Sequence, residues 1–135
     1  MSRLMQRFVL TFVLLAAAGV SAFAQGLPPY SYWKNQRGSE MKIFAVDPQG
    51  NFTGLYINNA PGYQCQGLPG FALSGRNCGT NVTFTVVWNN GIQNCHSRTI
   101  WQGHMLNPSV LPTTWVLIPD SGPRQQGADL FTQQR

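Results

Sequence analysis

Hydrophobic and polar side chains alternate most regularly in the stretch 81–103, NVTFTVVWNNGIQNCHSRTIWQG. Every second residue of its first half is apolar, a period typical of a β-strand with one buried face. An Asn-Asn-Gly segment follows and alternation resumes beyond it, which predicts a β-hairpin. In the second strand the face of Trp101 also carries two small hydroxyl residues, Ser97 and Thr99. Because a buried hydroxyl without a partner costs about 1–3 kcal/mol, this face is a candidate wall of a small-molecule site.

The same period recurs in short runs along the rest of the chain, with turn residues between them. We predict strands at about Tyr32–Gln36, Glu40–Val46, Asn51–Asn58, Phe71–Arg76, Asn81–Asn89, Ser97–Met105, Thr113–Pro119 and Asp129–Gln133. Val, Ile, Thr and aromatic residues fill these runs, and no helical period extends over a useful length. Sequential strands with mostly short loops predict an all-β fold, an eight-stranded antiparallel up-and-down β-barrel. A barrel of this size has room for one small ligand.

Alternation also assigns polar residues to the inside of the barrel, because they share a face with the apolar set of their strand. The inward polar set is Asn35, Ser39, Tyr56, Asn58, Ser97, Thr99 and Asp129, walled by Trp88, Trp101 and Trp115. Internal hydrogen bonding explains any one of them alone, but so many in one small barrel favour a ligand site. Asn35, Ser39 and Tyr56 can donate to one carbonyl oxygen. Asn58 and Asp129 can accept from two N–H groups, so the site suits a neutral polar head.

The first residues have the pattern of a secretory signal peptide. Two arginines precede an apolar run, Phe8–Ala18, and the small residues around Phe23 predict cleavage after Ala24. A membrane anchor is the alternative, and the shortness of the apolar run disfavours it. We therefore expect a signal peptide at residues 1–24 and one barrel domain at residues 25–135, in a protein that is secreted or periplasmic.

Charge and composition exclude several partners. The formal net charge is +5, but charged residues make up only 10% of the chain and form no Lys/Arg cluster, which disfavours nucleic-acid binding. No apolar run beyond the signal peptide is long enough to span a bilayer, so we expect no membrane association after cleavage. The Pro-rich segment Gln25–Ser31 is expected to be a frayed terminus.

The chain has three cysteines, so one is left over if a disulfide forms. In an up-and-down barrel the odd-numbered loops lie at one end and the even-numbered loops at the other. Cys65 falls in the third loop and Cys95 at the close of the fifth, whereas Cys78 falls in the fourth. The topology therefore predicts a Cys65–Cys95 disulfide and a free thiol at Cys78.

Six motifs of this chain resemble, in order and spacing, those of the avidin/streptavidin family of biotin-binding proteins. They are WKNQRGS, FTGLYIN, FTVVWNN, NCHSRTIWQG, TTWVL and GADLFTQ, spread from about Trp33 to Gln133. The cysteine positions and the short last loop are most similar to the dimeric bacterial avidins of the rhizavidin type. The resemblance implies a non-catalytic protein without a cofactor that binds biotin tightly inside its barrel.

The resemblance also implies a role for each site residue. Asn35, Ser39 and Tyr56 would bind the ureido oxygen of biotin, and Asn58 and Asp129 would accept from its N–H groups. Thr99 would contact the ring sulfur, and Ser97 with the loop after Asn58 would take the valerate carboxylate. Trp88, Trp101 and Trp115 would line the ring and tail, and Trp33 would close the barrel floor.

The chain departs from the family pattern in places. Arg37 stands where tetrameric relatives have an apolar residue at the mouth. It could pair with the ligand carboxylate or point into solvent, and we expect solvent, because charges in turns are mostly solvated. Asn58 replaces a serine of streptavidin, which keeps an acceptor but changes its reach. Tetrameric avidins close each site with a tryptophan from a neighbour's seventh loop, and the loop 120–127 contains none. We therefore expect a homodimer, with a monomer as the alternative.

Two other classes of function are disfavoured. An enzyme would need a carboxylate pair, metal-ligand spacing or a nucleophile motif; none is present, and both His96 and His104 alternate outward. A lipocalin-like carrier for another small apolar ligand would need a more apolar inner face. The sequons at Asn51 and Asn81 matter only in a glycosylating host. Sequestration, defence and storage of the vitamin fit the sequence equally well.

Overall fold

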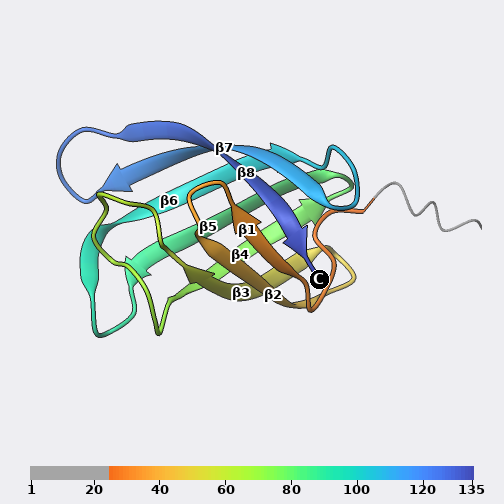
Figure 1. Ribbon diagram of the computed structural model, residues 1–135, viewed down its shortest axis with the longest axis horizontal. Helices are drawn as coiled ribbons and strands as arrows, with labels where there is room; N and C mark the ends of the chain where they lie inside the picture. Colours follow the sequence, from red (N-terminus) through yellow and green to blue (C-terminus); the bar gives the residue numbers. More distant parts are fainter. Residues whose placement is uncertain (1–24) are drawn as a thin grey trace, which may run out of the picture.

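The computed structural model describes residues 25–135, and the expected signal peptide lies outside them. The strands are β1 (Tyr32–Asn35), β2 (Glu40–Val46), β3 (Asn51–Ile57), β4 (Phe71–Cys78), β5 (Asn81–Asn89), β6 (Asn94–His104), β7 (Val110–Pro119) and β8 (Gln125–Gln134). Each pairs antiparallel with the next and β8 pairs with β1, so the sheet closes into a barrel (Figure 1). The predicted eight-stranded up-and-down β-barrel is confirmed. Among residues 25–135 no helix is long and apolar enough to span a membrane.

Three strands begin earlier than the alternation predicts. β6 begins at Asn94 rather than Ser97, β7 at Val110 rather than Thr113, and β8 at Gln125 rather than Asp129. The end of the β7–β8 ladder pairs Leu117 with Gln125, where one partner is polar and exposed. Backbone hydrogen bonds between strands need no apolar side chain, so the ladder continues beyond the hydrophobic pattern.

The barrel interior is filled by the alternate residues of each strand. In β5 the buried positions are every second residue from Val82 to Trp88. Phe84 stacks on Trp101 with ring centroids 4.9 Å apart and planes 12° apart, and it meets Phe131 edge to face at 5.8 Å. Each fully buried apolar side chain of this size contributes about 1.5–3 kcal/mol. The aromatic layer therefore contributes to the stability of the barrel core.

The segment before β1 covers one end of the barrel. Leu27 is 1% exposed, and its backbone N–H and C=O both bond to the side chain of Asn77, at 2.9 and 2.8 Å. Trp33 is fully buried and donates from Nε1 to Oγ of Ser31 at 2.8 Å. The expectation of a frayed terminus at Gln25–Ser31 is wrong, because Leu27 adds apolar burial and Asn77 supplies its backbone partners. The barrel is thus closed at this end.

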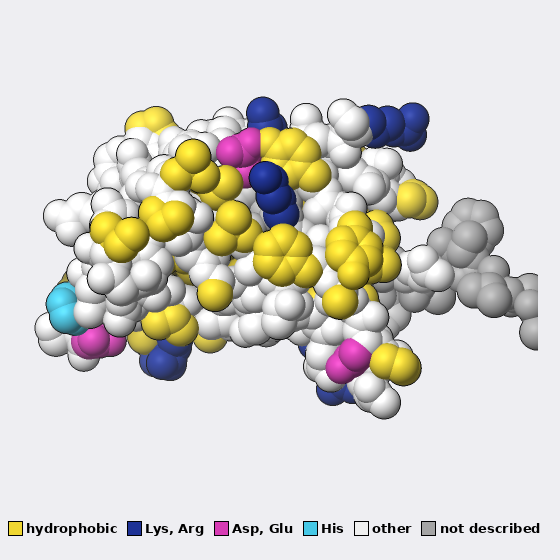
Figure 2. Space-filling view, turned by 90° about the horizontal axis from the view of Figure 1, so that it is seen from below, with side chains coloured by type: hydrophobic (Ala, Val, Ile, Leu, Met, Phe, Trp, Pro, Cys, Tyr) yellow, Lys and Arg dark blue, Asp and Glu magenta, His cyan; other side chains and the backbone are white. Residues whose placement is uncertain are grey.

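The outer surface carries aromatic side chains next to charged ones. The ring of Tyr32 lies between Lys34 and Lys42, whose Nζ atoms are 6.0 and 5.8 Å from its centroid, and its hydroxyl donates to Glu40. Figure 2 shows separate apolar side chains on one side of the barrel with basic side chains among them. A cation–π contact near the surface contributes about 0.5–1 kcal/mol.

Candidate ligand-binding site

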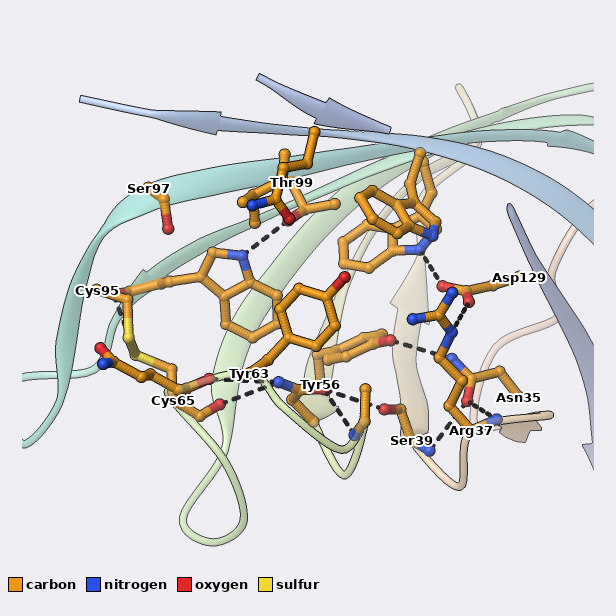
Figure 3. Close-up of a pocket in the computed structure, with 18 of the residues that line it drawn as sticks. Asn35, Arg37, Ser39, Tyr56, Tyr63, Cys65, Cys95, Ser97, Thr99 and Asp129 are labelled. Carbon is orange, nitrogen blue, oxygen red and sulfur yellow. Dashed lines mark hydrogen bonds and ion pairs between the residues drawn. A yellow bond between two sulfur atoms is a disulfide. The ribbon is translucent and has the colours of Figure 1, made fainter. Parts of the chain in front are cut away.

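A cavity of about 570 Å³ opens at the end of the barrel formed by the β1–β2, β3–β4, β5–β6 and β7–β8 loops. All ten residues predicted for the site line it: Asn35, Ser39, Tyr56, Asn58, Trp88, Ser97, Thr99, Trp101, Trp115 and Asp129. The lining also includes Arg37, Ala60, Gly62, Tyr63, Gln64, Cys65, Cys95, Leu117 and Gln125. This volume suits a small organic ligand held on several sides (Figure 3).

Hydrogen-bond donors gather at the β1–β2 turn. Oδ1 of Asn35 accepts from the backbone N–H groups of Arg37 and Ser39, both at 3.0 Å, which fixes the turn and leaves its Nδ2 facing the hydroxyl of Tyr56 at 3.4 Å. Burial raises the pKa of Tyr56, and the nearby Asp129 carboxylate raises it further. The phenol therefore stays protonated and able to donate at all physiological pH values.

Asn58 joins this cluster to the β3–β4 loop. Its Oδ1 accepts from Oγ of Ser39 at 3.2 Å and from the backbone of Ala60 at 3.0 Å. Its Nδ2 donates to the carbonyls of Gln64 and Cys65 at 3.5 and 3.4 Å. One amide thus holds the loop against the site and presents its oxygen to the same region as Ser39.

Asp129 is 6% exposed and has three donors around its carboxylate. Nε1 of Trp101 donates to Oδ2 at 2.9 Å, and Nε2 of Gln36 donates to Oδ1 at 3.2 Å. Nε of Arg37 lies 3.5 Å from Oδ1. The expectation that Arg37 points into solvent is wrong, because the buried carboxylate of Asp129 attracts the guanidinium into the cavity.

Three tryptophans form the walls. Trp88 donates from Nε1 to Oγ1 of Thr99 at 2.8 Å, which fixes both side chains. Trp101 packs against the ring of Tyr56 with centroids 4.9 Å apart. Trp115 lies directly over Gly127, where a Cβ would stand 2.4 Å from the indole, so only glycine allows this position. Each indole is thus held by a partner and offers a preformed apolar surface.

The predicted disulfide between Cys65 and Cys95 is present and ties the β3–β4 loop to β6. It lies beside the cavity mouth, and Tyr63 of the same loop projects into the cavity (Figure 3). Cys78 is a free, exposed cysteine, as predicted, although it is the last residue of β4 rather than a loop residue. The loop is therefore held both covalently and by the hydrogen bonds of Asn58.

Comparison with known proteins places this barrel and cavity among relatives. A sequence model of the Avidin family matches residues 24–134. The chain belongs to the Avidin family. Afifavidin of Afifella pfennigii is 42% identical over 120 residues, which cover 83% of this chain and 74% of afifavidin. Ligand-free shwanavidin matches with a TM-score of 0.76 at 35% identity, over 82% of this chain and 100% of that structure. A rhizavidin–biotin complex matches with a TM-score of 0.71 at 40% identity, over 78% of this chain and 92% of that structure.

Sequence reasoning missed three contributors to this avidin site. Gln36 and Arg37 reach Asp129 from the β1–β2 turn, and Tyr63 enters the cavity from the β3–β4 loop. The available signal for the first two was their place between Asn35 and Ser39, two predicted site residues in one tight turn. Tyr63 is the only aromatic residue in its loop. Strand periodicity assigns no direction to turn residues, so none of the three could be placed by it.

Both histidines of this avidin lie at the surface. His96 has Nδ1 3.7 Å from Oδ2 of Asp120, with both side chains more than 70% exposed. His104 contacts Asn81 and Thr80 and is exposed. In the part of the chain from residue 25 onward, no three His, Cys, Asp or Glu side chains are grouped as metal ligands.

Proposed function

We infer that this protein binds biotin inside its barrel and catalyses no reaction. The observation that carries the proposal is the convergence of three donors and two acceptors, opposite three tryptophans, in a cavity of about 570 Å³. A cyclic urea matches this arrangement, since one oxygen accepts and two N–H groups donate. Biotin complexes of the similar proteins rhizavidin and afifavidin support the choice of ligand.

The ureido oxygen is the proposed acceptor for Asn35, Ser39 and Tyr56. Ser39 donates to Oδ1 of Asn58 in this structure. A hydroxyl hydrogen rotates freely, so Ser39 can turn its hydrogen to the ligand oxygen. That rotation releases one lone pair of Asn58, which can then accept the first ureido N–H. A single hydroxyl rotation thus prepares both a donor and an acceptor.

Asp129 is the proposed acceptor of the second ureido N–H. A carboxylate offers about four acceptor positions, and Trp101, Gln36 and Arg37 occupy or approach three of them. One position on Oδ2 is left for the ligand. The resulting bond is charge-assisted and buried, the kind that contributes most to affinity.

The remaining roles follow from the cavity walls. Thr99 already accepts from Trp88, and its own hydrogen can point to the ring sulfur. Ser97 lines the mouth and makes no side-chain hydrogen bond to any of residues 25–135, so its hydroxyl is available for the valerate carboxylate. The tryptophans enclose the apolar ring and chain. The polar inner end disfavours a carrier of purely apolar ligands, because those groups would lose their partners.

Displacement of a biotin-analogue dye tests the proposal directly. We expect biotin to displace the dye at one equivalent per chain, and a medium-chain fatty acid of similar length to leave it bound. Displacement by the fatty acid and not by biotin would replace the biotin hypothesis with a lipocalin-like carrier.

A homodimer in a secreted or periplasmic setting is the proposed state of the mature chain, after loss of the signal peptide at residues 1–24. The β7–β8 loop supplies no tryptophan to a neighbour, whereas apolar side chains face outward from adjacent strands. Val87 is 57% exposed, and Ile100 pairs with Val116 across β6 and β7, both half-buried. Burial of this row against its copy would remove apolar surface from water.

A further inference from the structure

The cavity contains one positive and one negative side chain. Among its lining residues only Arg37 and Asp129 are charged. The formal charge of the cavity wall is therefore zero. A buried carboxylate without a cation beside it would attract positively charged ligands, so the guanidinium changes which ligands the wall favours.

Arg37 is directed inward by the geometry of its turn. Its backbone N–H bonds to Oδ1 of Asn35, and Gly38 follows with a φ of 85°, a conformation that glycine adopts readily. The guanidinium carbon lies 5.8 Å from the ring of Trp115, and the side chain is 35% exposed. The side chain therefore lies between a cavity wall and the carboxylate of Asp129.

The guanidinium has unused donors on the ligand side. At 3.5 Å its Nε contact with Asp129 is longer than an optimal charge-assisted bond of about 2.8 Å. Its side chain makes no hydrogen bond to any other group of residues 25–135. Its charge also acts on the polar head region, where Arg37 lowers and Asp129 raises the pKa of Tyr56, whose pKa burial raises most.

We propose that Arg37 is a specificity-determining residue, which strengthens the preference of the site for a neutral ureido head over a cationic head of the same shape. This inference rests on the proposed function. A cationic head beside Asp129 would gain attraction from its carboxylate but meet repulsion from Arg37, whose Nε lies 3.5 Å from that carboxylate. A neutral head would be affected little by either charge. In a partly solvated site, removal of the Arg37 charge should change the affinity for the cationic head, relative to the neutral head, by about tenfold to a hundredfold.

The test compares biotin with 2-iminobiotin, whose head is a guanidinium cation at neutral pH. Dissociation constants of both ligands are measured by dye competition at low salt for the parent, R37L, R37Q and R37K. R124L is the matched control, since Arg124 is exposed in the β7–β8 loop at the same end of the barrel and does not line the cavity. The imino group cannot accept from Asn35, Ser39 and Tyr56 as the ureido oxygen does. This loss is common to all variants and cancels when their ratios of dissociation constants are compared.

We expect the ratio of the two dissociation constants to fall about tenfold to a hundredfold in R37L and R37Q, and to stay at the parent value in R37K and R124L. An unchanged ratio in R37L and R37Q, with biotin still bound, would overturn the role of Arg37 alone. If R37L and R37Q lose affinity for biotin but not for biotin amide, Arg37 binds the valerate carboxylate instead. That result would also overturn the proposed role of Arg37. Failure of the parent to bind biotin would overturn the proposed function and this inference together.

Discussion

Reduction of the Cys65–Cys95 disulfide should destabilise the protein by an amount that follows from the sequence separation. The bridge spans 30 residues. The chain-entropy relation then gives about 3.6 kcal/mol at 25 °C from the restriction of the unfolded chain. For a domain of this size that corresponds to a fall in melting temperature of about 10–20 °C.

The measurement uses a Cys78→Ser background, because the exposed thiol of Cys78 would otherwise exchange with the opened pair. Ligand-free protein is unfolded with urea before and after reduction, at one protein concentration, since the stability of the proposed dimer would depend on concentration. Counting of free thiols verifies that both sulfurs are reduced.

A loss below about 1 kcal/mol would refute this reasoning, because it lies well under the entropic value. It would mean that the reduced unfolded chain keeps residual structure that already restricts the segment between the two cysteines. The same reduced protein should release biotin faster, because the loop that carries Tyr63 loses its attachment to β6.

Asp129→Ala should weaken biotin binding by about 2–5 kcal/mol, since it removes a buried charge-assisted acceptor, and a dissociation constant like that of the parent would show that the head lies elsewhere. Tyr56→Phe should cost about 1–3 kcal/mol in the same competition assay, with Tyr30→Phe, an exposed tyrosine outside the cavity, as control. The pKa of Tyr56 is raised in the folded state, so the stability that this group contributes is complete below about pH 10 and should fall as pH rises above it. Urea titrations at increasing pH should show this fall for the parent, and Tyr56→Phe should lack it. Light scattering should give twice the chain mass, and Ile100→Lys with Val116→Lys should give a monomer; a tetramer would contradict the proposed interface.

Most of the fold could be predicted because a barrel strand has one buried and one exposed face. The alternation around Phe84 and Trp88 sets the register of β5, and a slip by one residue would expose both. The strand ends were less predictable, since Gln125 and Gln126 join the ladder through their backbones alone.

The site residues differ in the same way, because those on strands could be predicted and some of those in turns could not. Strand residues such as Tyr56 and Thr99 could be assigned to the cavity by parity, and the family motifs indicated their roles. Arg37 could not, because its direction depends on a side-chain bond to Asn35 and on the distant charge of Asp129. The segment that holds Leu27 was mispredicted for the same reason, as its partner, Asn77, lies 50 residues away.

The disulfide also gives the barrel a mechanical property. It encloses β4 and β5 in a covalent ring, with Cα atoms 6.3 Å apart at its closure. A molecule stretched between its two ends can therefore extend only the chain on either side of the ring. Thirty residues span at most about 100 Å when fully extended, so an oxidised molecule under tension should be shorter than a reduced one by about that length. Single-molecule extension would thus measure the redox state of each barrel as a length.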